Sequence, residues 1–420
     1  MSYPSDSVYT RLQQRFDANI TGAPASPVFM QILRLLYSPQ EAHIASHLPV
    51  IPTPLESLAR RMGMPAYQLE SHLDRLARRG VVFDVSQGEK RYYALPPVVI
   101  GFFEYVFMRA REDLPMIELA HLFDEYMGQD ERFAQAVFEG DTQLARTLLR
   151  ESALSDENAS EVLDWEKASE IIRQAPSVHV TLCSCRHKAS LLGKACARPI
   201  ETCLTLGGDT LSKLGMARQI SHAEALDILA QAKTNGLMQV CDNVQRRPAF
   251  ICNCCSCCCG MVQAIRNFNL RHAIATSNWI MQVDLEKCTG CGKCIKICPV
   301  QAISLEIGEK LGKHRGWAVL DESLCLGCGV CASACPNGGV TFKARPQRTY
   351  TPTNLLERYI AMAVERGKLA ELVFSDPQNM SQRALKRILQ ALEHSMPFKA
   401  TLALKPLRSA FLEGVARLVD

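Results

Sequence analysis

The stretch CTGCGKCIKICP, from Cys288 to Pro299, carries four cysteines separated by two, two and three residues, and a proline follows the last of them. A second stretch, CLGCGVCASACP, repeats this spacing from Cys325 to Pro336. Three thiolates in one tight loop can reach one metal centre together, and the glycines between them let the backbone approach it closely. The two runs therefore predict a pair of metal centres bound by thiolates.

The C-x2-C-x2-C-x3-C-P pattern resembles that of bacterial two-cluster ferredoxins over roughly residues 280–343. The resemblance implies two [4Fe-4S] clusters whose sulfurs accept hydrogen bonds from loop amides. It also implies crossed ligation, because the proline turns the chain so that the fourth cysteine of each run reaches the other cluster. The ligands would be Cys288, Cys291, Cys294 and Cys335 for cluster 1, and Cys325, Cys328, Cys331 and Cys298 for cluster 2.

A pair of zinc ribbons is the alternative for these eight cysteines. Zinc sites pair one C-x2-C with another at a distance, so two complete runs ending in Cys-Pro are not needed for zinc. The chain departs from the ferredoxin pattern in one respect, since 26 residues separate Cys298 from Cys325. We expect LGKHRGWAV, residues 311–319, to lengthen the usual strand pair into a longer hairpin that leaves both clusters intact.

The 420 residues include 19 cysteines, none of them before Cys183. An odd count in a chain of this length argues against a disulfide scaffold and for a reducing compartment. The net charge of +4 is too small to indicate nucleic acid or an anionic membrane as a partner of the whole protein. The first residues, MSYPSDSVYTR, do not resemble a signal peptide, and the longest apolar run, Val98 to Met108, is too short for a membrane span. We expect a cytoplasmic protein.

A second group of cysteines precedes the two runs and follows no ordinary motif. On a strand, Cys183 and Cys185 would face the same side. On a helix that begins near Ser256, Cys255, Cys258 and Cys259 would share one face. A cysteine taken singly can be a small buried apolar residue, but so dense a group without metal is open to oxidation. We therefore expect at least one additional iron–sulfur cluster, with these candidate ligands: Cys183, Cys185, Cys196, Cys203, Cys254, Cys255 and Cys258.

Two further resemblances concern this cysteine-rich region. The CCG at Cys258–Gly260 resembles heterodisulfide-reductase subunits with non-cubane clusters, but the spacing to the next pair, Cys288 and Cys291, differs from that family. Its ligands are therefore not transferred. The order of CxCR, then NCCxCCC, then a dicluster ferredoxin is similar to cysteine-rich ferredoxin-type proteins of anaerobes.

The flanks predict a multidomain α+β protein. Helices expected over 27–37, 54–62 and 65–79, followed by a hairpin around Gln87-Gly88, resemble a winged helix-turn-helix over residues 27–97. The tail, with 12 Lys/Arg against 7 Asp/Glu in residues 345–420, reads as helical, and its charge is either a solvated surface or a docking site for an acidic partner. The predicted domains are 1–100 (winged-helix-like), 101–176 (helical connector), 177–279 (cysteine-rich), 280–343 (dicluster ferredoxin) and 344–420 (helical).

Three functions fit these features. The first is a ferredoxin-type subunit or donor that relays low-potential electrons to a flavin or metal oxidoreductase. The second is a redox-sensing transcription factor, but residues 1–100 hold only 10 Lys/Arg against 8 Asp/Glu, so we expect protein docking rather than DNA binding. The third is a reductase with catalysis at the upstream cluster. No P-loop or dinucleotide motif is present. The candidate DNA contacts of the second function are Gln68, Ser71, His72, Arg75, Arg78, Arg79, Lys90 and Arg91.

Overall fold

The computed structural model describes residues 5–154, 161–310, 313–373 and 380–393. The chain divides into two compact units. The first consists of Met1–Thr142, Thr210–Met216 and Leu355–Asp420, and the second of Gln143–Asp209 and Ala217–Asn354. None of the helices in the described residues is long and apolar enough to cross a membrane.

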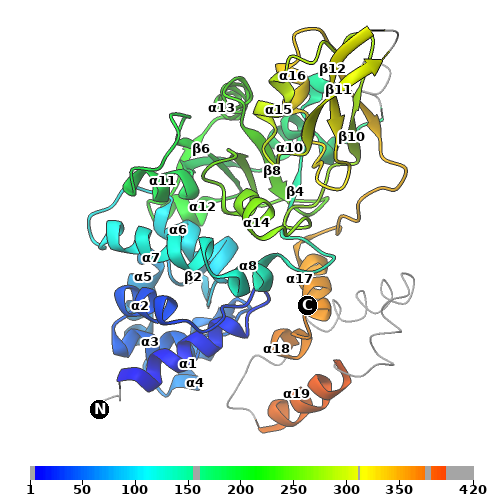
Figure 1. Ribbon diagram of the computed structural model, residues 1–420. Helices are drawn as coiled ribbons and strands as arrows, with labels where there is room; N and C mark the ends of the chain where they lie inside the picture. The colour runs from blue at the N-terminus through cyan, green and yellow to red at the C-terminus, as the bar shows by residue number, and fades with distance from the viewer. Residues whose placement is uncertain (1–4, 155–160, 311–312, 374–379, 394–420) are drawn as a thin grey trace. The chain divides into compact units, whose positions relative to one another are not determined.

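The first unit is mainly helical (Figure 1). Its first helices are α1 (Ser5–Asp17), α2 (Pro27–Leu36) and α3 (Pro39–Ser46), and phenylalanines and tyrosines from α1, α2 and α7 pack edge-on or stacked in its core. The remaining helical segments are α4 (Leu55–Met62), α5 (Ala66–Arg79), η1 (Val98–Phe102), α6 (Phe103–Phe107), α7 (Met116–Gly128), α8 (Glu131–Phe138), α12 (Asp209–Lys213), α17 (Leu355–Glu365), α18 (Leu369–Val373) and α19 (Met380–Glu393).

The predicted helix–turn–helix and hairpin are present in this unit. Helix α4 ends at Gly63 and α5 ends at Gly80, and both glycines adopt the left-handed conformation that stops a helix. Strands β2 (Phe83–Gln87) and β3 (Lys90–Ala94) form the hairpin, and the short strand β1 (Thr53–Pro54) joins it in the order β1-β3-β2. These elements confirm the expected secondary structure, and the winged-helix assignment stays a prediction. The helical prediction for residues 374–379 and 394–420 lies outside the described residues.

The second unit is built on a six-stranded antiparallel sheet with the order β4-β8-β9-β6-β5-β7. Helices α10 (Ala168–Gln174) and α13 (His222–Thr234) pack their apolar side chains against one face of the sheet. Leu204 and Ile251 of neighbouring strands lie in this core. The strands are β4 (Ala145–Thr147), β5 (Val178–Leu182), β6 (Glu201–Leu206), β7 (Arg218–Ile220), β8 (Met238–Asp242) and β9 (Phe250–Cys254).

One strand of this sheet comes from the segment that was predicted as a helical connector. Within residues 101–176, the expected helices α6, α7 and α8 are present. Strand β4 follows them and forms an edge strand that pairs with β8. In the described residues after β4, this segment contains the 3-10 turns η2 (Glu151–Ala153) and η3 (Asp164–Glu166) and helix α10. The segment predicted as a helical connector therefore contains one short strand besides its helices. A strand of three residues is too short for a periodicity argument to distinguish it from a helix.

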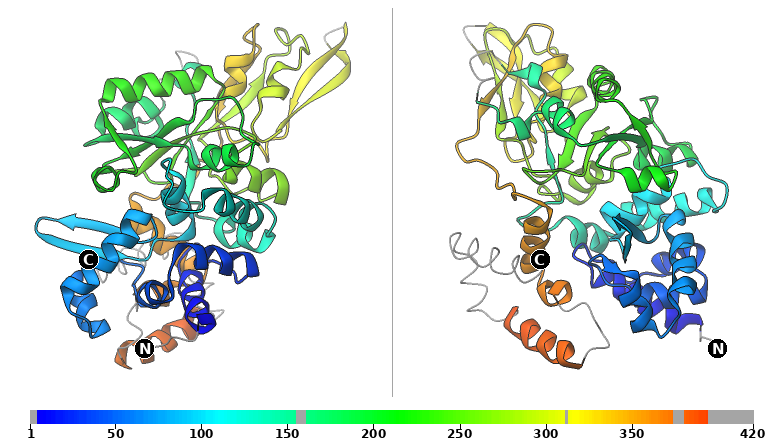
Figure 2. Two further views of the ribbon diagram at one scale, coloured as in Figure 1. Left: turned by 90° about the vertical axis from the view of Figure 1, so that its left-hand side faces the viewer. Right: turned by 180° about the vertical axis from the view of Figure 1, so that it is seen from behind.

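The two cysteine runs lie in the carboxy-terminal part of the second unit. Strand β10 (Trp279–Val283) pairs with β13 (Val340–Ala344), and the short helices α15 (Lys293–Ile297) and α16 (Val330–Ala334) pack against each other. Strands β11 (Ile303–Lys310) and β12 (Lys313–Leu320) lie side by side in Figure 2 and pair along their full length. The predicted long hairpin between the two runs is confirmed.

Candidate metal centres

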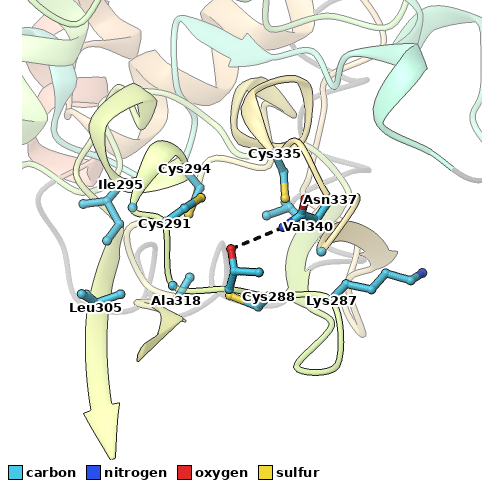
Figure 3. Close-up of a pocket in the computed structure, with 14 residues that line it drawn as sticks. Lys287, Cys288, Cys291, Cys294, Ile295, Leu305, Ala318, Cys335, Asn337 and Val340 are labelled. Atoms are coloured by element: carbon cyan, nitrogen blue, oxygen red, sulfur yellow. Dashed lines mark hydrogen bonds between the residues drawn. The ribbon is translucent and has the colours of Figure 1, made fainter. Parts of the chain in front are cut away.

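The first cysteine run and the end of the second run meet at one pocket (Figure 3). Gly292, in the left-handed conformation, precedes α15, so the loop before this helix and the helix itself present their thiols to the same space. On one side of the pocket, the Asn337 side chain donates a hydrogen bond of 3.3 Å to the Thr289 hydroxyl. The cysteines that line the pocket are Cys288, Cys291, Cys294 and Cys335. These are the four that the ferredoxin resemblance assigns to cluster 1.

The other four cysteines of the two runs are also neighbours, and they are more deeply buried. Burial raises the pKa of the Cys328 thiol to about 12, and the negative charges of Cys298 and Cys325 add to this effect. Burial also raises the pKa of the Cys331 thiol, and the negative charges of Cys298 and Cys325 again add to this effect. The amide of Ala302 donates a hydrogen bond of 3.3 Å to the Cys298 sulfur. The donor set, four thiols with an amide–sulfur hydrogen bond, fits a [4Fe-4S] cluster.

Two arginines, one buried and one half-buried, hold the backbone around this second quartet. Arg150 is only 3% exposed, its amide donates to the Cys328 carbonyl, and its guanidinium donates at 2.9 Å to the Ser333 hydroxyl and to the Leu237 carbonyl. Arg345 donates at 2.6 Å to the Cys325 carbonyl. Burial lowers the pKa of both arginines, and nearby cysteine thiolates oppose that shift. The quartet is therefore flanked by cations that can offset its negative charge.

The upstream cysteines form two separate groups. One is a belt of six thiols in which hydrogen-bond contacts run from each member to the next. Cys203 on β6 and Cys252 on β9 lie at its middle, on adjacent strands. Contacts with Cys203 and Cys254 lower the pKa of Cys252 to about 6 despite its burial. In order of contact, the belt consists of Cys183, Cys203, Cys252, Cys254, Cys259 and Cys185.

The other upstream group is a compact set of four thiols. It lies mostly in the turn between β9 and helix α14 (Gly260–Phe268), with one further member from the loop after helix α11 (Ser184–Leu191). Their Sγ atoms all lie within 4.8 Å of one another. The contact with Cys258 lowers the pKa of the Cys255 thiol to about 4. The members of this compact quartet are Cys196, Cys255, Cys257 and Cys258.

Arg186 lies between the belt and the compact quartet. It is 1% exposed, and its guanidinium donates to the Asn253 carbonyl at 2.9 Å and to the Thr202 hydroxyl. Burial lowers its pKa, but the thiolates of Cys183, Cys203 and Cys255 outweigh burial and raise it. The buried cation is therefore held by sulfur anions of both groups.

The structure corrects two local expectations. Strand β5 ends at Leu182, so Cys183 caps α11 and Cys185 lies in its first turn, instead of both lying on a strand. Helix α14 begins at Gly260, so Cys255 and Cys258 lie in the preceding turn and Cys259 is the capping residue, instead of sharing a helix face. In both places, the cysteine takes an extended backbone at a helix amino terminus, which a periodicity argument does not detect.

The predicted upstream ligands fall into both groups. Cys183, Cys185, Cys203 and Cys254 belong to the belt, whereas Cys196, Cys255 and Cys258 belong to the compact quartet. The prediction left out Cys252, Cys257 and Cys259. Strand alternation could have identified Cys252, because alternate residues of a strand face the same side. Cys252 therefore shares a face of β9 with Cys254, whereas Ile251 faces the other side. Cys241 belongs to neither group, because it lies in the apolar core under α10 and α13.

Comparison with known families gives a match in the region of the two cysteine runs. Residues 287–339 match the model of the 4Fe-4S dicluster domain. The match covers the two cysteine runs and the hairpin between them, and it confirms the ferredoxin-type domain predicted there. No curated protein and no solved structure matches the chain.

Proposed function

We propose that this iron–sulfur electron-transfer protein is a relay subunit that accepts electrons from one redox protein and passes them to a partner oxidoreductase. When bound, each [4Fe-4S] cluster supplies a one-electron couple. The ligands would be Cys288, Cys291, Cys294 and Cys335 for one cluster and Cys325, Cys328, Cys331 and Cys298 for the other, and the thiol belt would hold at least one more.

The observation that supports this proposal is that direct contacts within the second unit connect the upstream cysteines to the ferredoxin cysteines. Leu237 packs beside Cys255, and its carbonyl accepts a hydrogen bond from Arg150, whose amide donates to the Cys328 carbonyl. On the other side, Gly236 lies against Ile297, the residue before Cys298, so closely that a Cβ atom there would be 3.1 Å from its side chain. Redox centres held in this way have fixed separations, as a relay requires.

Exposed lysines around the first pocket support an acidic partner. Lys287 lines the pocket, and its side chain is 60% exposed, while Lys293 and Lys296 of α15 are exposed as well. Cys291 is also exposed, so this quartet is reachable from the surface. We propose this face, the lysine rim, as the exit for electrons.

The test is anaerobic reoxidation of the reduced protein by two probes, an acidic flavodoxin and a basic cytochrome c. We expect the flavodoxin rate to fall about tenfold in Lys293→Glu/Lys296→Glu and to fall with added salt, because opposite charges steer association. The cytochrome rate should not fall, and Arg173→Glu on α10 should change neither rate. Clusters that are destroyed by reduction, instead of reoxidising in repeated cycles, would contradict the electron-transfer proposal, whereas equal flavodoxin rates in all variants would contradict only the lysine rim.

A further inference from the structure

The compact quartet of Cys196, Cys255, Cys257 and Cys258 has the spacing of a site for a single ion. All four Sγ atoms lie within 4.8 Å of one another, and those of Cys257 and Cys258 are 3.6 Å apart. A tetrahedral ion with metal–sulfur bonds of about 2.3 Å holds its four sulfurs about 3.8 Å apart. The thiols thus already lie close to the positions that such an ion requires.

A cubane cluster requires a wider arrangement. Its four thiolates are bonded to the outer corners of a body of four irons, so they are held about 6 Å apart. Across the described ranges, the compact quartet is the single group of three or more metal-binding side chains whose ligand atoms all lie within 4.8 Å of one another. The two ferredoxin quartets are therefore more open than this one, as their larger cofactor demands.

We propose that Cys196, Cys255, Cys257 and Cys258 bind one tetrahedral divalent metal ion, zinc or iron, and not an iron–sulfur cluster. Four soft thiolates in tetrahedral geometry select these metals over magnesium, calcium or manganese. The region upstream of the ferredoxin domain then holds two different centres, a mononuclear site in the compact quartet and a cluster in the belt.

The turn that carries three of these ligands is held in place by α14. Gln263 donates from its side chain to the carbonyls of Ser256, at 2.8 Å, and Cys257, at 3.1 Å. Arg266 donates to the same Ser256 carbonyl at 3.0 Å. Because these bonds fix the backbone, the thiols need little rearrangement when the ion binds.

Amides also point at the sulfurs of the quartet. The amide of Cys258 donates to the Cys255 sulfur, and the amide of Cys196 donates to the Cys258 sulfur. Such bonds stabilise a thiolate that is bound to a metal.

The buried Arg186 supplies the charge that this site needs. Four thiolates and one divalent ion carry a net charge of −2, which is costly to bury without a cation nearby. Arg186 contacts Cys255, and its Nε atom has no hydrogen-bond partner within the described residues. The charged groups that act most strongly on this guanidinium are the thiolates of Cys183, Cys203 and Cys255, so sulfur anions are its counter-charge.

The test compares the metal and acid-labile sulfide content of the full-length protein, purified without oxygen, with that of the double variant Cys257→Ser/Cys258→Ser. We expect the variant to lose about one zinc or iron per chain and no sulfide, since a mononuclear site contains none. Elemental analysis then identifies which of the two metals occupies the site. Ser256→Ala, in the same turn, should retain both metal and sulfide, because the carbonyl that α14 holds is preserved.

A joint loss of about four irons and four sulfides would overturn the proposal in favour of a cubane. An unchanged metal content would overturn it as well. If the double variant unfolds and loses all its cofactors, the metal and sulfide content of the wild-type protein is the test. Iron plus zinc should exceed sulfide by about one atom per chain, and equal amounts would overturn the single-ion site. Where the excess metal is zinc, X-ray absorption at the zinc edge should show four sulfur neighbours and no iron neighbour.

Discussion

Arg150 and Arg345 are single residues that act on the second cysteine quartet through charge as well as through hydrogen bonds. Reduction adds a negative charge to a centre whose ligands are already anionic thiolates. A buried cation nearby therefore favours the reduced state and raises the reduction potential. Arg150 is the better residue for a test, because its guanidinium bonds to a side chain and a carbonyl outside the quartet.

We expect Arg150→Met to lower the reduction potential of the cluster assigned to Cys298, Cys325, Cys328 and Cys331 by tens of millivolts, measured by redox titration with EPR detection. Arg150→Lys keeps the charge and should restore most of the potential. Arg173→Met, which removes an exposed arginine, is the control and should leave both clusters unchanged. Equal potentials in the Met and Lys variants would show that Arg150 acts through packing alone.

The crossed assignment of the Cys-Pro cysteines makes a second prediction for a single residue. Because Cys298 neighbours Cys325 and not the pocket of Cys288, Cys298→Ala should alter the EPR signal of the cluster in the buried quartet. The cluster at the pocket should keep its signal. Cys335→Ala is the matched variant, with the opposite expected outcome. Loss of the pocket cluster in Cys298→Ala would overturn the crossed ligation.

At the scale of elements, the loop of the first cysteine run and the long hairpin fit tightly together. A Cβ atom on Gly290 would lie 2.5 Å from the carbonyl oxygen of Gly316 on β12, whereas a Cβ atom on Gly292 would meet nothing within 4 Å. Both glycines have a positive φ, so alanine is strained at either position by about 1–2 kcal/mol. The two positions therefore differ in packing and not in backbone strain.

We expect Gly290→Ala to lower the free energy of unfolding by several kcal/mol more than Gly292→Ala, because the hairpin must move away from the loop. The pocket cluster should also be lost faster on exposure to oxygen in Gly290→Ala. Thermal unfolding measures the first effect, and the decay of the cluster absorbance in air measures the second. Similar losses in the two variants would mean that the hairpin yields easily and does not hold the loop.

How much could be predicted from the sequence also depends on the element. The two cysteine runs were predicted because their ligands are local and their spacing is fixed by one loop. The upstream groups depend instead on which strands are adjacent, and the pairing of β6 with β9 brings Cys203 to Cys252 across 48 intervening residues. The periodicity of residues within one segment does not indicate such a contact between distant strands. Cys196 joins Cys257 in the same way, through a loop without regular structure.

For the whole molecule, the cysteine groups predict the cofactor content. Eight cysteines account for two cubanes, and the belt supplies six further thiols, so the protein purified without oxygen should contain more than about eight irons and eight sulfides per chain. The excess sulfide, and the iron bound with it, should disappear in Cys252→Ser/Cys254→Ser and persist in Cys241→Ala, which removes a cysteine from the apolar core. Saturation at about eight irons in the wild-type protein, with the belt thiols open to alkylation, would exclude a cluster in the belt.

The charges of the first unit predict that the protein does not bind DNA. Arg91, a candidate phosphate contact on the hairpin, lies 2.6 Å from a carboxylate oxygen of Asp74 and 2.5 Å from one of Asp84. Arg79 at the end of α5 is paired with Glu41 at 2.8 Å. Cations that are already neutralised within the fold release few counterions from DNA, and so contribute little to affinity.

We therefore expect no sequence-specific binding near physiological salt in gel-shift titrations with the promoter of the protein's own operon. The double variant Asp74→Asn/Asp84→Asn should be titrated in the same way for comparison. Because it removes two of the carboxylates that pair with Arg91 and leaves only the weaker contact with Glu70 at 3.0 Å, it should gain weak, nonspecific affinity that falls steeply as salt is raised. The wild-type protein should show neither the affinity nor the salt slope. Tight binding by the wild-type protein that resists competitor DNA and disappears in Arg75→Ala or Arg78→Ala would instead establish a redox-responsive regulator, in which the cysteine groups control contact with DNA.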